Sequence, residues 1–224
     1  MGVTRQSAAP KKASGKKTRR GSDAASHAPV LKGQPGDKAS LILEAALDLF
    51  RQYGYRRTSM EDIATAAQVA KGTLYLYFKS KDELFEALAR HLAAQIEQDL
   101  IQALALDVDL ESKLLAVLDA KLGFVYRWVL SSPHAAELTD PTSRLPDDVF
   151  GPVDQMLRRK LSDLFKEAAK RGELDLAAAG LTPELAVDTL LVAAHGAEFG
   201  AASESEFHDR LARIARLTLR GLRA

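Results

Sequence analysis

A run of basic and aromatic residues, KGTLYLYFKSKDELF at 71–85, carries the side chains best suited to contact a polyanion. Lysine ammonium groups pair with phosphate oxygens, and threonine and tyrosine hydroxyl groups donate hydrogen bonds to them. In a short helix over about 71–78, the 3.6-residue period turns Leu74 and Phe78 inward, together with Val69 before it. The side chains left pointing outward are Lys71, Thr73, Tyr75 and Tyr77. The run therefore predicts a surface for a negatively charged partner; the alternative is two half-buried tyrosines among solvated lysines.

The other reactive residue types form no catalytic or metal-binding pattern. The five histidines are scattered, and none has the paired spacing of a zinc-binding helix. HAAE at 134–137 and HGAE at 195–198 place His and Glu one helical turn apart, which a surface or pocket hydrogen bond also explains. The sequence has no cysteine, no phosphate-binding glycine loop and no nucleophile elbow. We expect no enzyme activity, no catalytic residue, no metal and no cofactor.

Two helices before the basic run would hold it in place. Apolar residues at helical spacing predict a first helix that follows Asp37, a possible cap, and ends at Gly54. Thr58 or Ser59 can cap a short second helix over about 59–66, whose small inward residues permit close packing. A break at AQVA then leads into the basic run. Two short helices separated by a turn indicate a helix-turn-helix.

A helix-turn-helix places its second helix in the DNA major groove, with the residues near that helix's N-terminus closest to base edges. Lys71 and Thr73 would reach base edges or nearby phosphates, and the backbone N–H of Gly72 could approach closely because no side chain intervenes. The remaining hydroxyl and ammonium groups would face phosphate oxygens. The candidate DNA-binding residues are Thr58, Ser59, Lys71, Gly72, Thr73, Tyr75, Tyr77 and Lys81.

The rest of the chain is predicted to be helical, with no two-residue alternation and no internal repeat. Residues 1–36 are rich in Ser, Ala, Gly, Lys and Pro and predict a disordered basic arm. We expect an all-α fold of about nine helices. The later helices are expected over about 81–105, 110–131, part of 131–148, 148–170, 182–200 and from Ser203 onward.

The segment ILEAALDLFRQYGYRRTSMEDIATAAQVAKGTLYLYFKSKDEL resembles the DNA-binding domain of the TetR family of bacterial transcriptional repressors. Two helices, a turn and an aromatic-lysine segment recur in order, over about a fifth of the chain. One difference lies at the turn, where the family usually has Gly-Val-Ser and this chain has Gln68, Val69 and Ala70. Gln68 is expected to take a positive φ, and Ala70 offers no capping hydroxyl.

The resemblance implies three segments: the arm at 1–36, a DNA-binding domain at 37–84 and a regulatory domain at 85–224. In the family, a ligand bound to the regulatory domain changes the distance between the two DNA-binding domains of the dimer, and the fourth helix transmits this change. We expect an unidentified, largely apolar small-molecule effector. Its candidate contacts, each of which core packing would also explain, are Phe124, Trp128, His134, Met156, Phe165, His195 and Glu198.

Two successive major-groove half-sites lie about 34–36 Å apart, so such a protein needs a two-fold dimer. The last two predicted helices carry apolar stripes and small residues, which favour a four-helix interface between two copies. The alternative is that these stripes pack only within one subunit. The candidate interface residues are Leu185, Thr189, Val192, Gly196, Phe199, Gly200, Phe207, Leu211, Ile214 and Leu217.

Charge is distributed unevenly along the chain. Residues 1–85 hold 15 Lys and Arg against 8 Asp and Glu, whereas residues 86–224 hold 16 against 22. A positive first part suits nucleic acid. No apolar run is long enough to span a membrane or to act as a secretory signal, so we expect a cytoplasmic location and no membrane partner. The sequence favours a ligand-responsive repressor that binds an inverted-repeat operator as a homodimer; the alternative is a sequence-tolerant architectural DNA-binding protein.

Overall fold

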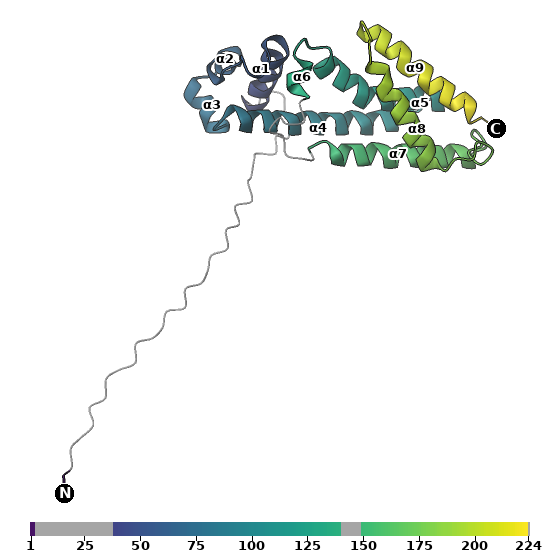
Figure 1. The fold of residues 1–224 in the computed structure, drawn as a ribbon, viewed down its shortest axis with the longest axis horizontal. Coiled ribbons are helices and arrows are strands. Elements are labelled where there is room, and N and C mark those ends of the chain that lie inside the picture. Colours follow the sequence, from purple (N-terminus) through teal and green to yellow (C-terminus); the bar gives the residue numbers. More distant parts are fainter. Residues whose placement is uncertain (3–37, 140–148, 224) are drawn as a thin grey trace. The chain divides into compact units, whose positions relative to one another are not determined.

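The computed structural model describes residues 1–2, 38–139 and 149–223. In this part of the chain the secondary structure is entirely helical (Figure 1), which confirms the all-α prediction. Residues 3–36 of the predicted arm, the expected cap Asp37 and residues 140–148 lie outside the described residues. Nine α-helices are described: α1 Lys38–Tyr53, α2 Met60–Ala66, α3 Lys71–Tyr77, α4 Lys81–Ala105, α5 Leu110–Leu118, α6 Ala135–Leu138, α7 Gly151–Lys170, α8 Pro183–His195 and α9 Glu204–Gly221. Among them, no helix combines the length and apolar character needed to cross a lipid bilayer.

The first three helices share a small hydrophobic core. Helix α1 turns one wide apolar face inward, and α2 and α3 cover it with a few large side chains. The fully buried side chains of this core include Ile42, Leu43, Phe50, Ile63, Leu74 and Phe78. Leu74 and Phe78 are buried as predicted, while Val69 is only partly buried at the core's edge.

Helix α4 contributes to both cores of the described chain. Its first half places Leu84 and Leu88 in the small core, and its second half places Ile96 and Leu100 in a larger core with α5, α7, α8 and α9. Its bounds agree with the predicted helix over 81–105. The N-cap is Ser80, whose side chain accepts a hydrogen bond from the backbone N–H of Glu83. A single long helix therefore connects the DNA-binding candidate region to the rest of the chain.

The helix predicted over 110–131 begins as expected but changes geometry. The α-helical part ends at Leu118, and two π-helical segments follow, Asp119–Gly123 and Tyr126–Leu130. At Gly123 the reason for the small residue is visible, because an added Cβ would lie 1.8 Å from Oδ1 of Asp119. π-helical turns are rare and widen the helix locally.

Two predictions for the last helices need correction. Helix α8 starts at the Thr182 cap with Pro183 as predicted, but it ends at His195 rather than near Gly200. A short 3₁₀ turn, Gly196–Glu198, follows it, and Gly200 adopts a φ of +68° as the chain reverses toward the Ser203 cap of α9. Gly196 and Gly200 therefore do not lie one turn apart on a shared helix face.

The second correction concerns the predicted dimer stripe on α9. Phe207 and Leu211 are 1% and 0% exposed, because they pack in the large core of their own subunit. The ring of Phe207 stacks on Tyr126 with centroids 4.4 Å apart. These two residues have no surface left to offer a second copy. Helix α9 instead uses these two residues of the stripe to close its own subunit.

Candidate nucleic-acid interface

The turn between α2 and α3 sets the direction of the second helix. Gln68 has a φ of 55°, the one positive φ of a non-glycine residue in the described chain, which confirms the expectation made for it. The backbone N–H groups of Gln68 and Val69 bond back to the carbonyls of Thr65 and Ala64, and these bonds end α2. Ala70 is the N-cap of α3 and makes no side-chain capping bond. The turn forms without the glycine and serine of the usual family pattern.

Helix α3 buries one face and exposes the other. Leu74 is fully buried, whereas Lys71, Gly72 and Tyr75 are exposed. The Lys71 ammonium lies 5.9 Å from the centroid of the Tyr75 ring. Thr73 and Tyr77 are half-buried, with the Tyr77 ring 6.4 Å from that of Phe78.

Leu76 is a surface residue of α3 that the sequence interpretation did not single out. Its side chain is 86% exposed, whereas Leu74, two positions earlier, is fully buried. The signal was present in the sequence, since a residue two positions after the buried Leu74 lies about 200° around the helix from it. Leu76 thus belongs to the same open side of α3 as the basic and aromatic residues.

Lys71 is held by a carboxylate of the neighbouring helix. Its ammonium forms an ion pair with Glu61 of α2. The hydrogen bond between the two side chains raises the pKa of Lys71 and lowers the pKa of Glu61. An incoming phosphate or base must therefore compete with Glu61 for this ammonium group.

Ser59 and Thr58 have different surroundings. Ser59 forms a capping box with Asp62: its side chain accepts a bond from the Asp62 N–H, and its own N–H donates to the Asp62 carboxylate at 2.9 Å. The Ser59 hydroxyl also donates to this carboxylate at 2.6 Å, and this bond, together with the one from the Ser59 N–H, lowers the pKa of Asp62. Thr58 is only 3% exposed, and its hydroxyl donates to the carbonyl oxygen of Gly54 at 2.8 Å. The structure therefore does not place the Thr58 side chain at the surface, and its hydroxyl anchors the loop instead.

Lys81 secures the same loop from the start of α4. Its ammonium donates to the carbonyl oxygens of Tyr55 at 2.8 Å and Thr58 at 2.9 Å, and lies 4.4 Å from the Tyr55 ring centroid. The Tyr55 hydroxyl in turn bonds Asp82. Because these contacts engage the ammonium group, Lys81 joins the α1–α2 loop to α4.

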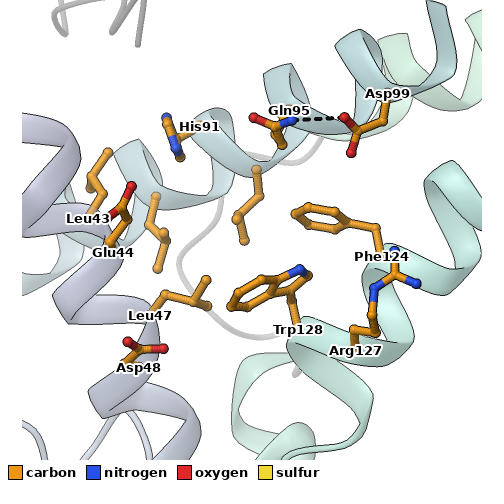
Figure 2. Close-up of a pocket in the computed structure, with 12 residues that line it drawn as sticks. Leu43, Glu44, Leu47, Asp48, His91, Gln95, Asp99, Phe124, Arg127 and Trp128 are labelled. Carbon is orange, nitrogen blue, oxygen red and sulfur yellow. Dashed lines mark hydrogen bonds between the residues drawn. The ribbon is translucent and has the colours of Figure 1, made fainter. Parts of the chain in front are cut away.

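The candidate effector contacts do not form a single site. Phe124 and Trp128 lie together, with ring centroids 6.2 Å apart, in a cavity of about 460 Å³ that also borders α1 and α4 (Figure 2). Glu198 lines a second cavity, of about 620 Å³, near the start of α9. Phe165 is fully buried in the large core, and Met156 packs against that core. His195 is exposed with its ring bonded to the Leu191 carbonyl, and His134 lies near Gly54.

The candidate dimer residues fall into two groups. Phe207 and Leu211 are internal, as described above. Ile214 is half-buried, and the other candidates are exposed: Leu185, Thr189, Val192, Gly196, Phe199, Gly200 and Leu217. Val192 and Phe199 are 68% and 75% exposed in the single subunit.

The fold and this surface define a helix-turn-helix protein with a second, larger helical core. Residues 42–88 match the family model described as "Bacterial regulatory proteins, tetR family". In this segment the chain is similar to the TetR family of bacterial regulatory proteins.

Known relatives are similar mainly in this segment. The chain is 43% identical over 68 residues to the uncharacterised HTH-type transcriptional regulator YhgD of Bacillus subtilis, which is 30% of this chain and 36% of that protein. It is 46% identical over 55 residues to the HTH-type transcriptional regulator RutR of Escherichia coli K12, which is 25% of this chain and 26% of RutR. The match to the first of these relatives thus spans about a third of its length. An uncharacterised HTH-type transcriptional regulator of Haemophilus influenzae is 27% identical over 77% of this chain and 86% of its own length.

Solved structures extend the likeness of fold to most of the chain. A regulator of the TetR/AcrR family from Thermobifida fusca has a TM-score of 0.63 at 24% identity, covering 84% of this chain and 100% of that one. The fatty acid degradation regulator FadR from Bacillus halodurans has a TM-score of 0.61 at 20% identity, covering 85% and 99%. At these identities the likeness concerns the fold alone.

Proposed function

We propose that this chain is a DNA-binding transcriptional regulator, acting in the cytoplasm as a ligand-responsive repressor that binds an inverted-repeat operator as a homodimer. The observation that carries the proposal is the two-sided character of α3. Leu74 fixes the helix to the core, while Lys71, Tyr75 and Leu76 project from it. We place DNA binding in residues 37–84 and ligand binding and dimerisation in residues 85–224.

The exposed side of α3 suits a major groove. Lys71 offers a cation to a base edge or a phosphate, and the Tyr75 hydroxyl can donate to a phosphate oxygen. Leu76 offers an apolar contact, for which the C5-methyl group of thymine is the matching feature in the groove. Ser59 and Gly72 add exposed backbone and hydroxyl groups nearby. Lys81 and Thr58 support this surface by holding the loop before α2.

The exposed apolar side of α8 supports the homodimer. Leu185 and Val192 follow each other at two-turn spacing on this helix, and Leu217 extends the apolar surface on α9. Helices α8 and α9 contact each other within the subunit. Two such pairs, related by a two-fold axis, would form a four-helix interface and present two copies of α3 to successive grooves.

Ligand response is supported by the place of the cavity beside Phe124 and Trp128. Its walls include α1 of the DNA-reading part and α4, which enters both cores (Figure 2). A small molecule bound there would contact α1 and α4, which share the small core with α3. A FadR from Bacillus subtilis, 18% identical with a TM-score of 0.58, was solved in complex with stearoyl-CoA. That complex is a reason to search for an effector of this chain, but it does not identify the effector.

The decisive experiment selects DNA from a random pool with the full-length chain and then measures binding to the selected and scrambled sequences. A regulator of this kind enriches an inverted repeat and binds it at least a hundredfold more tightly than scrambled DNA. An architectural protein would enrich no common sequence and bind both DNAs alike. Equal binding of selected and scrambled DNA would contradict the repressor and favour the architectural DNA-binding protein.

A further inference from the structure

The cavity beside Phe124 and Trp128 has an apolar floor built from three parts of the chain. We call it the α1–α4 pocket; its lining residues are Leu43, Glu44, Leu47, Asp48, Leu88, His91, Leu92, Gln95, Asp99, Phe124, Arg127 and Trp128. Figure 2 shows the ring of Trp128 directed toward the side chain of Leu47 on α1. Its volume of about 460 Å³ is within the range of small-molecule sites. A molecule with an aromatic or aliphatic body would find complementary surface there.

The polar side of the α1–α4 pocket is predominantly acidic. Glu44 and Asp48 come from α1, and Asp99 comes from α4. Within the described residues Glu44 has no ion-pair partner, and Asp48 lies 3.9 Å from Arg51. Asp99 accepts a hydrogen bond from the neutral amide of Gln95 at 2.9 Å. Three carboxylates thus border the pocket with little direct neutralisation.

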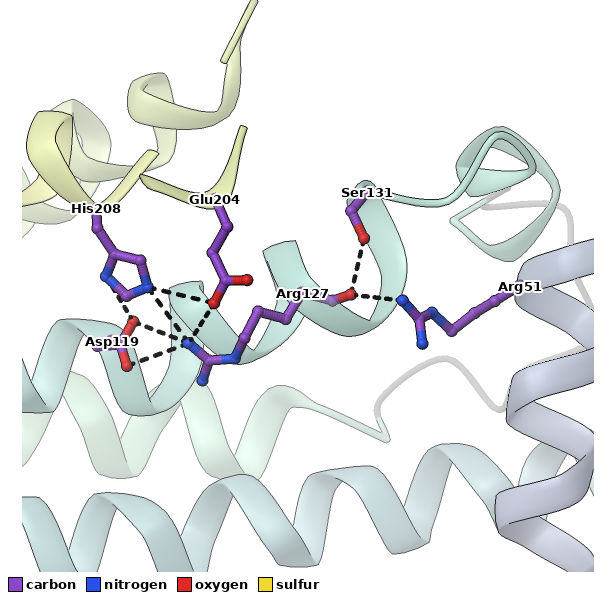
Figure 3. Close-up of polar contacts among 6 residues, drawn as sticks. All are labelled: Arg51, Asp119, Arg127, Ser131, Glu204 and His208. Carbon is purple, nitrogen blue, oxygen red and sulfur yellow. Dashed lines mark hydrogen bonds and ion pairs between the residues drawn. The ribbon is translucent and has the colours of Figure 1, made fainter. Parts of the chain in front are cut away.

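The arginine that lines the α1–α4 pocket is already committed to other carboxylates. The guanidinium of Arg127 lies 3.3 Å from Asp119 and 3.5 Å from Glu204, outside the pocket (Figure 3). Its charge is therefore balanced by partners that do not border the cavity. The charge left facing a ligand is negative.

Trp128 already takes part in a cation–π contact. The guanidinium carbon of Arg51 lies 5.1 Å from its ring centroid. The ring remains 36% exposed, so the contact with Arg51 does not enclose it. Aromatic rings beside carboxylates attract organic cations, because the ring face and the carboxylates both favour positive charge while the apolar surface favours the ligand body.

We propose that the α1–α4 pocket binds an amphipathic organic cation, with its apolar body against the leucines and aromatic rings and its positive charge toward Glu44 and Asp48. The inference rests on the proposed function, since it names the chemical class of the effector. It also predicts coupling between ligand binding and DNA binding. Because the ligand touches α1 as well as α4 and the π-helical segment, its binding and DNA binding change each other's affinity by the same factor.

The direct test uses Trp128, which is the single tryptophan of the chain and therefore an intrinsic fluorescent reporter. The full-length protein is titrated with methyltriphenylphosphonium, a permanent cation with an apolar body, and with triphenylphosphine oxide, a neutral molecule of similar shape. Calorimetry on the same samples detects binding that leaves fluorescence unchanged. We expect saturable binding of the cation at least tenfold tighter than that of the neutral molecule. Equal affinities, or no saturable binding of the cation by either method, would overturn the proposal.

Charge-removing variants locate the site. The double variant Glu44→Gln, Asp48→Asn should weaken cation binding at least tenfold and leave binding of the neutral molecule unchanged. Glu97→Gln is the matched control, because Glu97 is exposed on α4 but does not line the pocket. An unchanged cation affinity in the double variant, with the fold intact by circular dichroism, would remove the pocket from consideration.

A parallel DNA-binding assay separates this inference from the proposed function. Preference for a selected operator without any binding of the cation would leave the regulator in place and overturn the ligand class. Binding of the cation in the α1–α4 pocket without any sequence preference for DNA would support the pocket chemistry and overturn the proposed regulator.

Discussion

The Nη2 atom of Arg51 donates a hydrogen bond to the backbone carbonyl oxygen of Arg127, at 3.1 Å (Figure 3). Arg51 belongs to α1 of the DNA-binding candidate region, whereas the Arg127 side chain reaches Glu204 and His208 at the start of α9. The hydroxyl of Ser131 donates to the same carbonyl at 2.8 Å. Arg127 therefore contacts α1 through its backbone carbonyl and α9 through its side chain, so it connects the DNA-binding candidate region to a helix of the proposed dimer surface.

Gly123 makes room for the carboxylate that holds Arg127. An added Cβ would meet Oδ1 of Asp119 at 1.8 Å, so Gly123→Ala must displace that carboxylate. We expect Gly123→Ala to lower the free energy of unfolding in the wild-type background by about 1 kcal/mol, because it disturbs the charged hydrogen bonds of Asp119. In an Asp119→Ala background the clash is absent, and the same change should stabilise by about 0.5–1 kcal/mol. Urea unfolding of the four proteins tests this, and equal effects in the two backgrounds would contradict it.

Gln68 occupies a backbone conformation that glycine adopts more easily. Gln68 has a φ of 55°, which is strained for a residue with a Cβ. Gln68→Gly should therefore raise the free energy of unfolding by about 0.5–1 kcal/mol, because the steric relief is only partly offset by the greater freedom of glycine in the unfolded chain. Gln68→Ala keeps the steric cost and is the control, expected within about 0.5 kcal/mol of wild type. Urea titration followed by circular dichroism measures both. A destabilised glycine variant would show that the Gln68 side chain contributes contacts that outweigh the backbone cost.

We expect Glu61 to compete with DNA for the Lys71 ammonium, because the two side chains form an ion pair. Glu61→Gln should strengthen binding to all DNA sequences by about two- to tenfold at low salt, since it frees the ammonium and removes a negative charge near phosphate. Lys71→Ala should weaken binding and lower the slope of log affinity against log salt by about 1. Gel-shift titrations at several salt concentrations measure both effects. Asp163→Asn, an exposed change on α7, is the control for net charge, and an equal gain there would contradict a local role for Glu61.

Leu76 is predicted to read an apolar feature of the operator. Leu76→Ala should leave the free energy of unfolding within about 0.5 kcal/mol of wild type, because the side chain is 86% exposed. Leu76→Ala should weaken binding to the selected operator by about three- to tenfold. Replacing the thymines of the half-site by deoxyuridine, which removes their methyl groups, should weaken binding by a similar factor. The two losses should not add, because each change removes the same contact. Leu74→Ala, by contrast, should destabilise the protein by about 2–5 kcal/mol because Leu74 is fully buried. Additive losses from Leu76→Ala and deoxyuridine would exclude the methyl contact.

Val192 and Phe207 distinguish a surface between subunits from a core within one. Val192→Asp should yield a folded monomer that keeps weak general attraction to DNA and loses at least tenfold in preference for the inverted repeat. Phe207→Asp should instead unfold the large core, because it buries an unpaired charge in a single subunit. Light scattering and thermal unfolding of the two variants make the comparison. A full-strength Val192→Asp dimer would place the interface elsewhere.

Features governed by neighbouring residues could be predicted from the sequence alone. The bounds of α4, the caps at Ser59, Thr182 and Ser203 and the positive φ of Gln68 depend on hydrogen bonds and steric contacts within a few residues. The inward direction of Leu74 and Phe78 follows from helical periodicity. The likeness to the TetR family followed from the segment 42–88, because a helix-turn-helix is a local arrangement.

The tertiary structure decided what the apolar and charged side chains contact. An apolar stripe on α9 can face a partner or its own subunit, and the packing of Phe207 and Leu211 chooses the second. Thr58 and Lys81 are predicted from the sequence as phosphate contacts. In the structure the Thr58 hydroxyl is buried on the nearby Gly54 carbonyl, and the Lys81 ammonium bonds two carbonyls 26 and 23 residues away, so both support the loop before α2. Phe124 and Trp128 meet α1 only because the folded chain brings together segments about 80 residues apart. Helical periodicity specifies which side of a helix is apolar, but the neighbour that covers it is chosen by packing of the whole chain.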